Sequence, residues 1–147
     1  YTHWQRQFLH PALLAFDAPA REECTAERPR SNTPLAALVM LNDPTQVEAA
    51  RALAERVLRQ NTYGLKDRFN TLGQQVLSRA FNNQEQILLA KLLREHIEDF
   101  EAEPAEADKL IRTGIAPVPR AIPPVELAAW TSVARAVLNL HETITRN

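Results

Sequence analysis

Charged and polar side chains gather in the first 32 residues of the chain, which show no hydrophobic period of 2 or 3.6 residues. Those that could bind or position a ligand are Asp17, Arg21, Arg28, Arg30 and Asn32. Arginine binds planar anions through two parallel hydrogen bonds, so this set could recognise a carboxylate, a sulfate or a sugar acid. The same side chains could instead pair with one another and hold the segment against the rest of the fold. We favour this structural interpretation, because a long loop must satisfy many backbone polar groups.

A second set of polar side chains lies in Asn42-Asp43-Pro44. Asparagine and aspartate accept hydrogen bonds from the first N–H groups of a helix, and proline is favoured at the first helical position. We therefore interpret Asn42 and Asp43 first as a turn and a helix cap, and second as binding residues. Asn32 and Thr33 precede another proline and have the same capping interpretation.

Nucleophilic and metal-binding residue types are few. Cys24 is the only cysteine, so an internal disulfide is excluded. Because no histidine lies near it in the sequence, we interpret Cys24 as a buried inert thiol rather than a nucleophile. A metal site of His3, His10 and His141 stays open, although no ligand spacing supports it. The CxxCH haem motif and the HExxH zinc motif are absent. We find no catalytic constellation and expect no haem or transition metal in this chain.

Composition indicates the class of protein. The chain has 147 residues, 45% hydrophobic and 24% charged, which is typical of a soluble globular protein, and we treat residues 1–147 as one domain. A net charge of -1 argues against nucleic acid as the main partner. No apolar run is long enough to span a membrane. Because the chain starts at Tyr1 and shows no signal peptide, we expect it to be a fragment of a larger protein.

Proline, asparagine and aspartate divide residues 33–147 into helices with apolar residues every three or four positions. The expected helices are 35–41, 44–60, 67–81, 83–103, 105–113 and 125–145. The four prolines of 116–124 predict an extended connector. No segment alternates as a strand would, so the predicted fold class is all-α, an irregular bundle of five or six helices. The expected core includes Leu53, Val57, Leu77, Phe81, Leu88, Leu92, Trp130 and Val137.

Residues 1–32 are expected to form an ordered, non-helical N-terminal arm. The apolar side chains of this arm are too many for a solvated tail: Trp4, Phe8, Leu9, Leu13, Leu14 and Phe16. We expect them to pack onto the helical body of residues 33–147. The arm's charges would then pair with one another, Asp17 with Arg21, Arg28 or Arg30.

Several phrases of the chain resemble one known family. They are Phe16-Asp17-Ala18-Pro19, Arg21-Glu22, Cys24, Asn32-Thr33-Pro34-Leu35, Leu41-Asn42-Asp43-Pro44, Glu48 to Ala54, Leu127 to Thr131 and Leu138 to Arg146. Over nearly its whole length the chain is similar to the C-terminal part of the domain of unknown function numbered fifteen fifty-three. That family occurs in Planctomycetes and relatives, in proteins that also carry planctomycete-type cytochrome c modules. Ser31, Ala36 and His141 depart from the usual Thr, Gln and Asp, and the last two change polarity or charge where a site could depend on them.

The resemblance implies an exported protein, periplasmic or at the cell surface, with haem on a separate module of the same polypeptide. It implies no established reaction. We therefore expect a helical structural or interaction module at the C-terminus of a larger cytochrome-c-associated protein, with the other domains of that polypeptide as partners. The alternative is that Asp17, Arg21 and Arg30 contribute to an active or binding site shared with upstream domains. Its substrate would be carbohydrate or sulfated sugars, by analogy with the family's polysaccharide-degrading hosts.

Overall fold

Prolines begin most of the helices in the computed structural model, which describes residues 13, 15, 18, 34–60 and 64–144. Residues 34–60 and 64–144 contain helices and no strand, so the predicted all-α class is confirmed. The helices are α2 (Pro34–Asn42), α3 (Pro44–Arg59), α4 (Leu65–Leu77), α5 (Asn83–Ala102), α6 (Pro104–Ile111), α7 (Pro124–Leu138) and α8 (His141–Ile144). A proline suits the first helical position because its missing N–H would have no partner there.

Two helices end earlier than the sequence predicts. Helix α4 ends at Leu77, because Ser78 adopts a left-handed conformation with φ of 60°. Phe81, expected inside that helix, lies beyond the turn and is still buried. The predicted helix 125–145 is divided at Asn139, whose N–H bonds to the carbonyl oxygens of Arg135 and Ala136. This division into α7 and α8 gives seven helices in residues 34–60 and 64–144, one more than the upper expectation.

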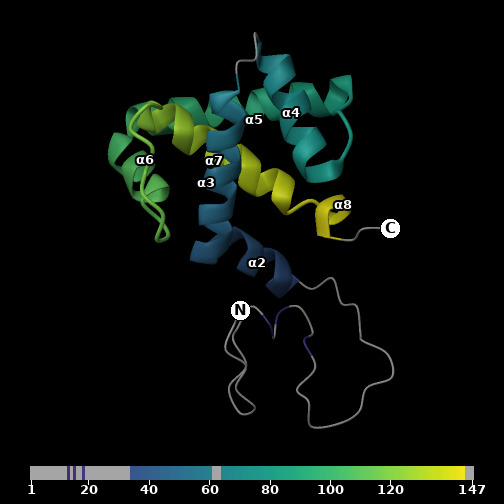
Figure 1. Ribbon diagram of the computed structural model, residues 1–147, viewed down its shortest axis with the longest axis horizontal. Coiled ribbons are helices and arrows are strands. Elements are labelled where there is room, and N and C mark those ends of the chain that lie inside the picture. Colours follow the sequence, from purple (N-terminus) through teal and green to yellow (C-terminus); the bar gives the residue numbers. More distant parts are fainter. Residues whose placement is uncertain (1–12, 14, 16–17, 19–33, 61–63, 145–147) are drawn as a thin grey trace.

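Helix α7 lies at the centre of the fold. It packs against α3, α5 and α6, and eight of its 15 residues are buried. The Trp130 ring lies 5.3 Å from the ring of Phe69 on α4, measured between centroids. Figure 1 shows α7 running across the fold towards α8, with α3 crossing it. The core is therefore organised around one central helix, and burial of each large side chain contributes about 1.5–3 kcal/mol.

Most of the predicted core is confirmed. The side chains of Val57, Phe81, Trp130 and Val137 are buried, and three others are partly buried and pack against the core, Leu53, Leu77 and Leu92.

The prediction for Leu88 is wrong, because this side chain is 67% exposed. Its neighbour Ile87 is 68% exposed. The apolar run from Ile87 to Leu89 turns through about 200° of the helix, so only part of it can face the core. Leu89 is the member that packs there.

The N-terminal arm lies almost wholly outside the described residues. Within residues 1–32 the structure describes Leu13, Ala15 and Ala18, of which the first two are helical. That the arm as a whole is non-helical therefore stays a prediction. The expected packing of the arm's apolar side chains onto the body concerns residues outside the described ranges.

Candidate functional site

Five of the seven predicted binding residues lie outside the described residues: Asp17, Arg21, Arg28, Arg30 and Asn32. The other two lie at the junction of α2 and α3. The Asp43 carboxylate accepts a hydrogen bond from the N–H of Thr45 at 2.8 Å. The side-chain amide of Asn42 donates to the carbonyl oxygen of Leu38 at 3.0 Å. Both side chains therefore satisfy backbone groups at a helix end, as the capping interpretation predicts.

The histidines and the cysteine do not come together in the part of the chain that the structure describes. Cys24, His3 and His10 lie outside the described ranges, and His141 is exposed at the start of α8. His96 on α5 is half-buried and stacks on Phe100, with ring centroids 6.1 Å apart. Residues 34–60 and 64–144 hold no cluster of three or more His, Cys, Asp or Glu side chains arranged as metal ligands. None of the described helices has the length and apolar character needed to span a membrane.

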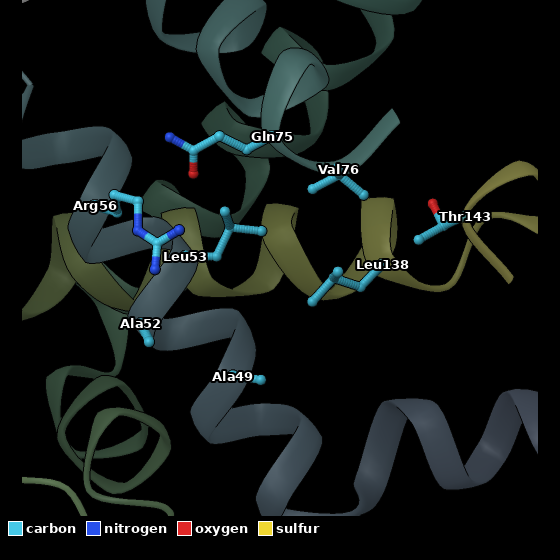
Figure 2. A pocket seen from close by; sticks show the side chains of 8 residues that line it. All are labelled: Ala49, Ala52, Leu53, Arg56, Gln75, Val76, Leu138 and Thr143. Carbon is cyan, nitrogen blue, oxygen red and sulfur yellow. The ribbon is translucent and has the colours of Figure 1, made fainter. Parts of the chain in front are cut away.

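An open groove of about 590 Å³ lies where α3, α4, α7 and α8 meet. Figure 2 shows Leu53, Val76 and Leu138 pointing toward one another from three helices, with the guanidinium of Arg56 beside Leu53. The other lining residues are Ala49, Ala52, Gln75 and Thr143. The groove thus combines apolar side chains with one positive charge and a few polar groups.

The charge of Arg56 is not neutralised within the groove. Arg56 is exposed, and it has no ion-pair partner among residues 34–60 and 64–144. The preceding residue, Glu55, is instead paired with Arg59, with 2.6 Å between Oε1 and Nη2. Arg56 therefore keeps its hydrogen-bond donors available to a ligand.

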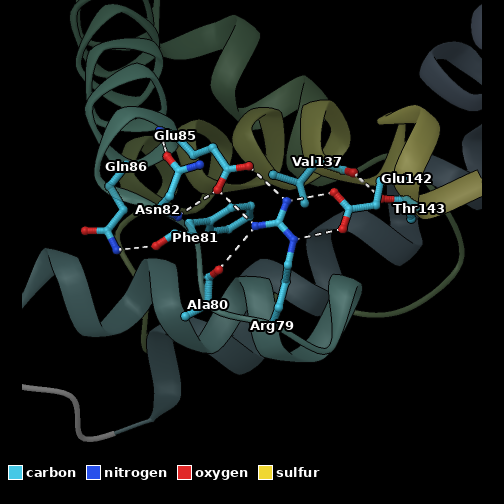
Figure 3. Close-up of polar contacts among 9 residues, drawn as sticks. All are labelled: Arg79, Ala80, Phe81, Asn82, Glu85, Gln86, Val137, Glu142 and Thr143. Atoms are coloured by element: carbon cyan, nitrogen blue, oxygen red, sulfur yellow. Dashed lines mark hydrogen bonds and ion pairs between the residues drawn. The ribbon is translucent and has the colours of Figure 1, made fainter.

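An ion-pair network fixes α8, which supplies Thr143 to the groove. Arg79, in the turn between α4 and α5, donates from Nη2 and Nη1 to the Glu85 carboxylate at 2.9 Å and 3.0 Å. It also donates from Nη2 and Nε to the Glu142 carboxylate at 2.7 Å and 2.8 Å. Figure 3 shows Arg79 between these two carboxylates. Two bidentate pairs on one guanidinium hold α8 against the α4–α5 turn.

The network also fixes the charge states of its members. The hydrogen bond from Arg79 is the main cause that lowers the pKa of Glu85, followed by the bond from the N–H of Asn82. Glu85 and Asn82 form a reciprocal capping box at the start of α5. Arg79 is likewise the main cause that lowers the pKa of Glu142, and the pKa of Arg79 is raised by Glu142 and Glu85. These three charged groups pair with one another and connect α8 to the start of α5.

A second polar contact fastens the connector between α6 and α7 to α3. The Glu48 carboxylate accepts hydrogen bonds from the N–H groups of Ile115 at 2.9 Å and Ala116 at 2.7 Å, and these bonds lower the pKa of Glu48. The buried Arg51 guanidinium donates to the carbonyl oxygens of Ala116 at 2.9 Å and Pro117 at 3.3 Å. The connector is without helix, as its prolines predict. Its course is set by two side chains one turn apart on α3.

Sequence reasoning missed the groove and both polar contacts. The Asn82-x-x-Glu85 spacing could have predicted the capping box from the sequence. The i and i+3 spacing of Glu48 and Arg51 could likewise have placed both side chains on one helix face. The partners of these residues could not be read in the same way. Glu142 lies 63 residues from Arg79, and Ala116 lies 68 residues from Glu48.

A match to a protein family covers more than half of the chain. A family model described as PSD1, "Protein of unknown function (DUF1553)", matches residues 1–93. The matched range contains Arg56 and Arg79 but ends before α7 and α8, so the groove and the ion-pair network each extend beyond it. No match was found among curated proteins or among solved structures.

Proposed function

We propose that this chain, which belongs to the DUF1553 family, is a helical interaction module of a larger protein. The family is described only as proteins of unknown function, so membership of it indicates no reaction. Its partner in this proposal is another domain of the same polypeptide. We propose further that this polypeptide is exported, that it carries haem on a separate planctomycete-type cytochrome c module, and that the present chain forms its C-terminal part. The sequence phrases that resemble the family support these last points.

The observation that carries the proposal is the uncovered apolar surface of α5. Only Leu93 among the 20 residues of this helix is buried. Ile87 and Leu88 are 68% and 67% exposed. Lys91, three to four residues later on the same side of the helix, is exposed too. Two adjacent large apolar side chains therefore stand on the outward side of a long helix.

The size of this surface favours a tethered partner. Full burial of one large apolar side chain stabilises by about 1.5–3 kcal/mol, so covering the exposed two-thirds of Ile87 and Leu88 contributes roughly 2–4 kcal/mol. Association of two separate proteins costs about 4–15 kcal/mol in lost freedom. The patch alone is too small to hold a separate protein. A domain of the same polypeptide meets the patch at an effective concentration in the millimolar range, which lowers that cost.

Thiol labelling of the full-length polypeptide tests the proposal. Ile87→Cys and Glu98→Cys are introduced separately in a Cys24→Ser background, because both positions are exposed on α5 in this chain. We expect N-ethylmaleimide to modify the Ile87→Cys variant at least about tenfold more slowly than the Glu98→Cys variant, since a partner domain excludes water from buried apolar contacts. Labelling in denaturant, where both thiols should react alike, controls for intrinsic reactivity. Equal labelling rates in the native polypeptide would contradict the proposal.

A further inference from the structure

The groove between α3, α4, α7 and α8 takes no residue from α5 and is separate from the proposed interaction surface. We propose that this groove binds a small carboxylate with an apolar body, such as a medium-chain fatty acid. The carboxylate pairs with Arg56, and the hydrocarbon covers Leu53, Val76 and Leu138.

The walls of the groove offer apolar side chains to a hydrocarbon chain. Its volume of about 590 Å³ lies inside the range of roughly 300–1,000 Å³ that is usual for small-molecule sites. Ala49 and Ala52 line it with short side chains on α3. The three larger apolar side chains, Leu53, Val76 and Leu138, are each only partly buried. They leave apolar surface in the groove that a ligand can remove from water.

The charge of the groove selects a monoanion. Arg56 offers a planar fork of donors, which matches a carboxylate through two parallel hydrogen bonds. The nearest carboxylates on its own helix are engaged elsewhere: Glu55 by Arg59, and Glu48 by the backbone of the connector. On α8, Glu142 is held by Arg79. The Thr143 hydroxyl already donates to the carbonyl oxygen of Val137 at 2.8 Å. Gln75 is the remaining donor, and Figure 2 shows it across the groove from Arg56.

The helical walls argue against a peptide as the occupant. The described walls come from α3, α4, α7 and α8, whose backbone groups are largely used within the helices. An extended peptide would bring its own N–H and C=O groups into the groove with no sheet edge to pair with, and burying unpaired polar groups is costly. A hydrocarbon chain brings no such groups.

Methyl NMR titration of the full chain tests the proposal. Sodium octanoate should shift the methyl resonances of Leu53, Val76 and Leu138 saturably, with a Kd in roughly the millimolar range or tighter. The uncharged 1-octanol, which has the same chain length, should bind at least about tenfold more weakly because it cannot pair with Arg56.

Two matched variants separate the role of Arg56 from a general effect of charge. Arg56→Gln should weaken octanoate binding at least about tenfold, whereas Arg94→Gln should change it less than about twofold. The second variant removes the same charge from an exposed arginine of α5, a helix that gives no residue to the groove. Methyl spectra without ligand show whether each variant keeps the fold. The proposal is overturned if octanoate leaves the three residues unshifted, if octanol binds equally well, or if both variants weaken binding alike.

Discussion

Gly73 is the position where the structure makes its sharpest prediction about stability. It lies in α4, where replacing glycine with alanine ordinarily stabilises a helix by about 0.5–1 kcal/mol. Here Gly73 is buried, and a Cβ would lie 2.6 Å from the carbonyl oxygen of Arg79 and 3.1 Å from the Phe81 ring. The first contact is with backbone, so it cannot be relieved by a side-chain rotation alone.

The expected magnitude follows from the two opposing effects. Overpacking that forces backbone shifts costs typically about 1–3 kcal/mol, which exceeds the helix-propensity gain of about 0.5–1 kcal/mol. We therefore expect Gly73→Ala to lower the free energy of unfolding by about 1–2 kcal/mol and to lower Tm by roughly 2–8 °C. The disturbance should reach the ion-pair network, because the Arg79 guanidinium lies 6.0 Å from the centre of the Phe81 ring.

Urea and thermal unfolding, each monitored by far-UV circular dichroism, measure this change. Gly64→Ala is the matched control, since the nearest atom to a Cβ there is Asp67 Oδ2 at 3.9 Å. We expect the control to stay within about 0.5 kcal/mol of the original chain. A Gly73→Ala chain that is as stable as the original, or more stable, would refute the close packing of the α4–α5 turn.

Two further predictions concern the polar contacts, and a third concerns the N-terminal arm. Glu85 and Glu142 have lowered pKa values, so their contribution to stability is present above the ordinary carboxylate pKa and is lost as pH falls. Arg79→Leu removes their partner. It should therefore lower Tm at neutral pH and make Tm fall less steeply between about pH 5 and pH 2. An identical Tm–pH curve would contradict the network. Glu48→Gln should speed amide hydrogen exchange at Ile115 and Ala116, which Glu48 now holds, while an unchanged rate would show that the connector is fixed by other contacts. Arg30→Ala should destabilise the chain by about 1–3 kcal/mol if it leaves a buried carboxylate unpaired, whereas an unchanged Tm with lost binding or activity in the full-length protein would favour the shared-site alternative.

The helices could be predicted because the residues that begin and cap a helix lie within a few positions of its end in the sequence. Pro34 and Pro44 begin helices as expected, and the caps Asp43 and Asn82 bond to the backbone of the helices that they begin. Errors arose where tertiary packing decided the outcome. The apolar residues of α5 surround much of the helix, and periodicity alone could not show that Leu93 faces the core while Leu88 faces outward.

The candidate site was less predictable than the fold. Asn42 and Asp43 were correctly interpreted as helix-end residues, but the groove depends on side chains from four helices that only folding brings together. Arg56 carries no special signal in the sequence. Its availability follows from the pairing of Glu55 with Arg59 rather than with Arg56, and a list of charged residues does not contain that choice.

The measurement that tests the central claim most directly is a structure of the full-length polypeptide that contains this chain. The account predicts that another domain covers the outward side of α5, so that the exposures of Ile87 and Leu88 fall from 68% and 67% to roughly a tenth or less. A structure in which both side chains face solvent, with no domain seated on α5, would contradict it.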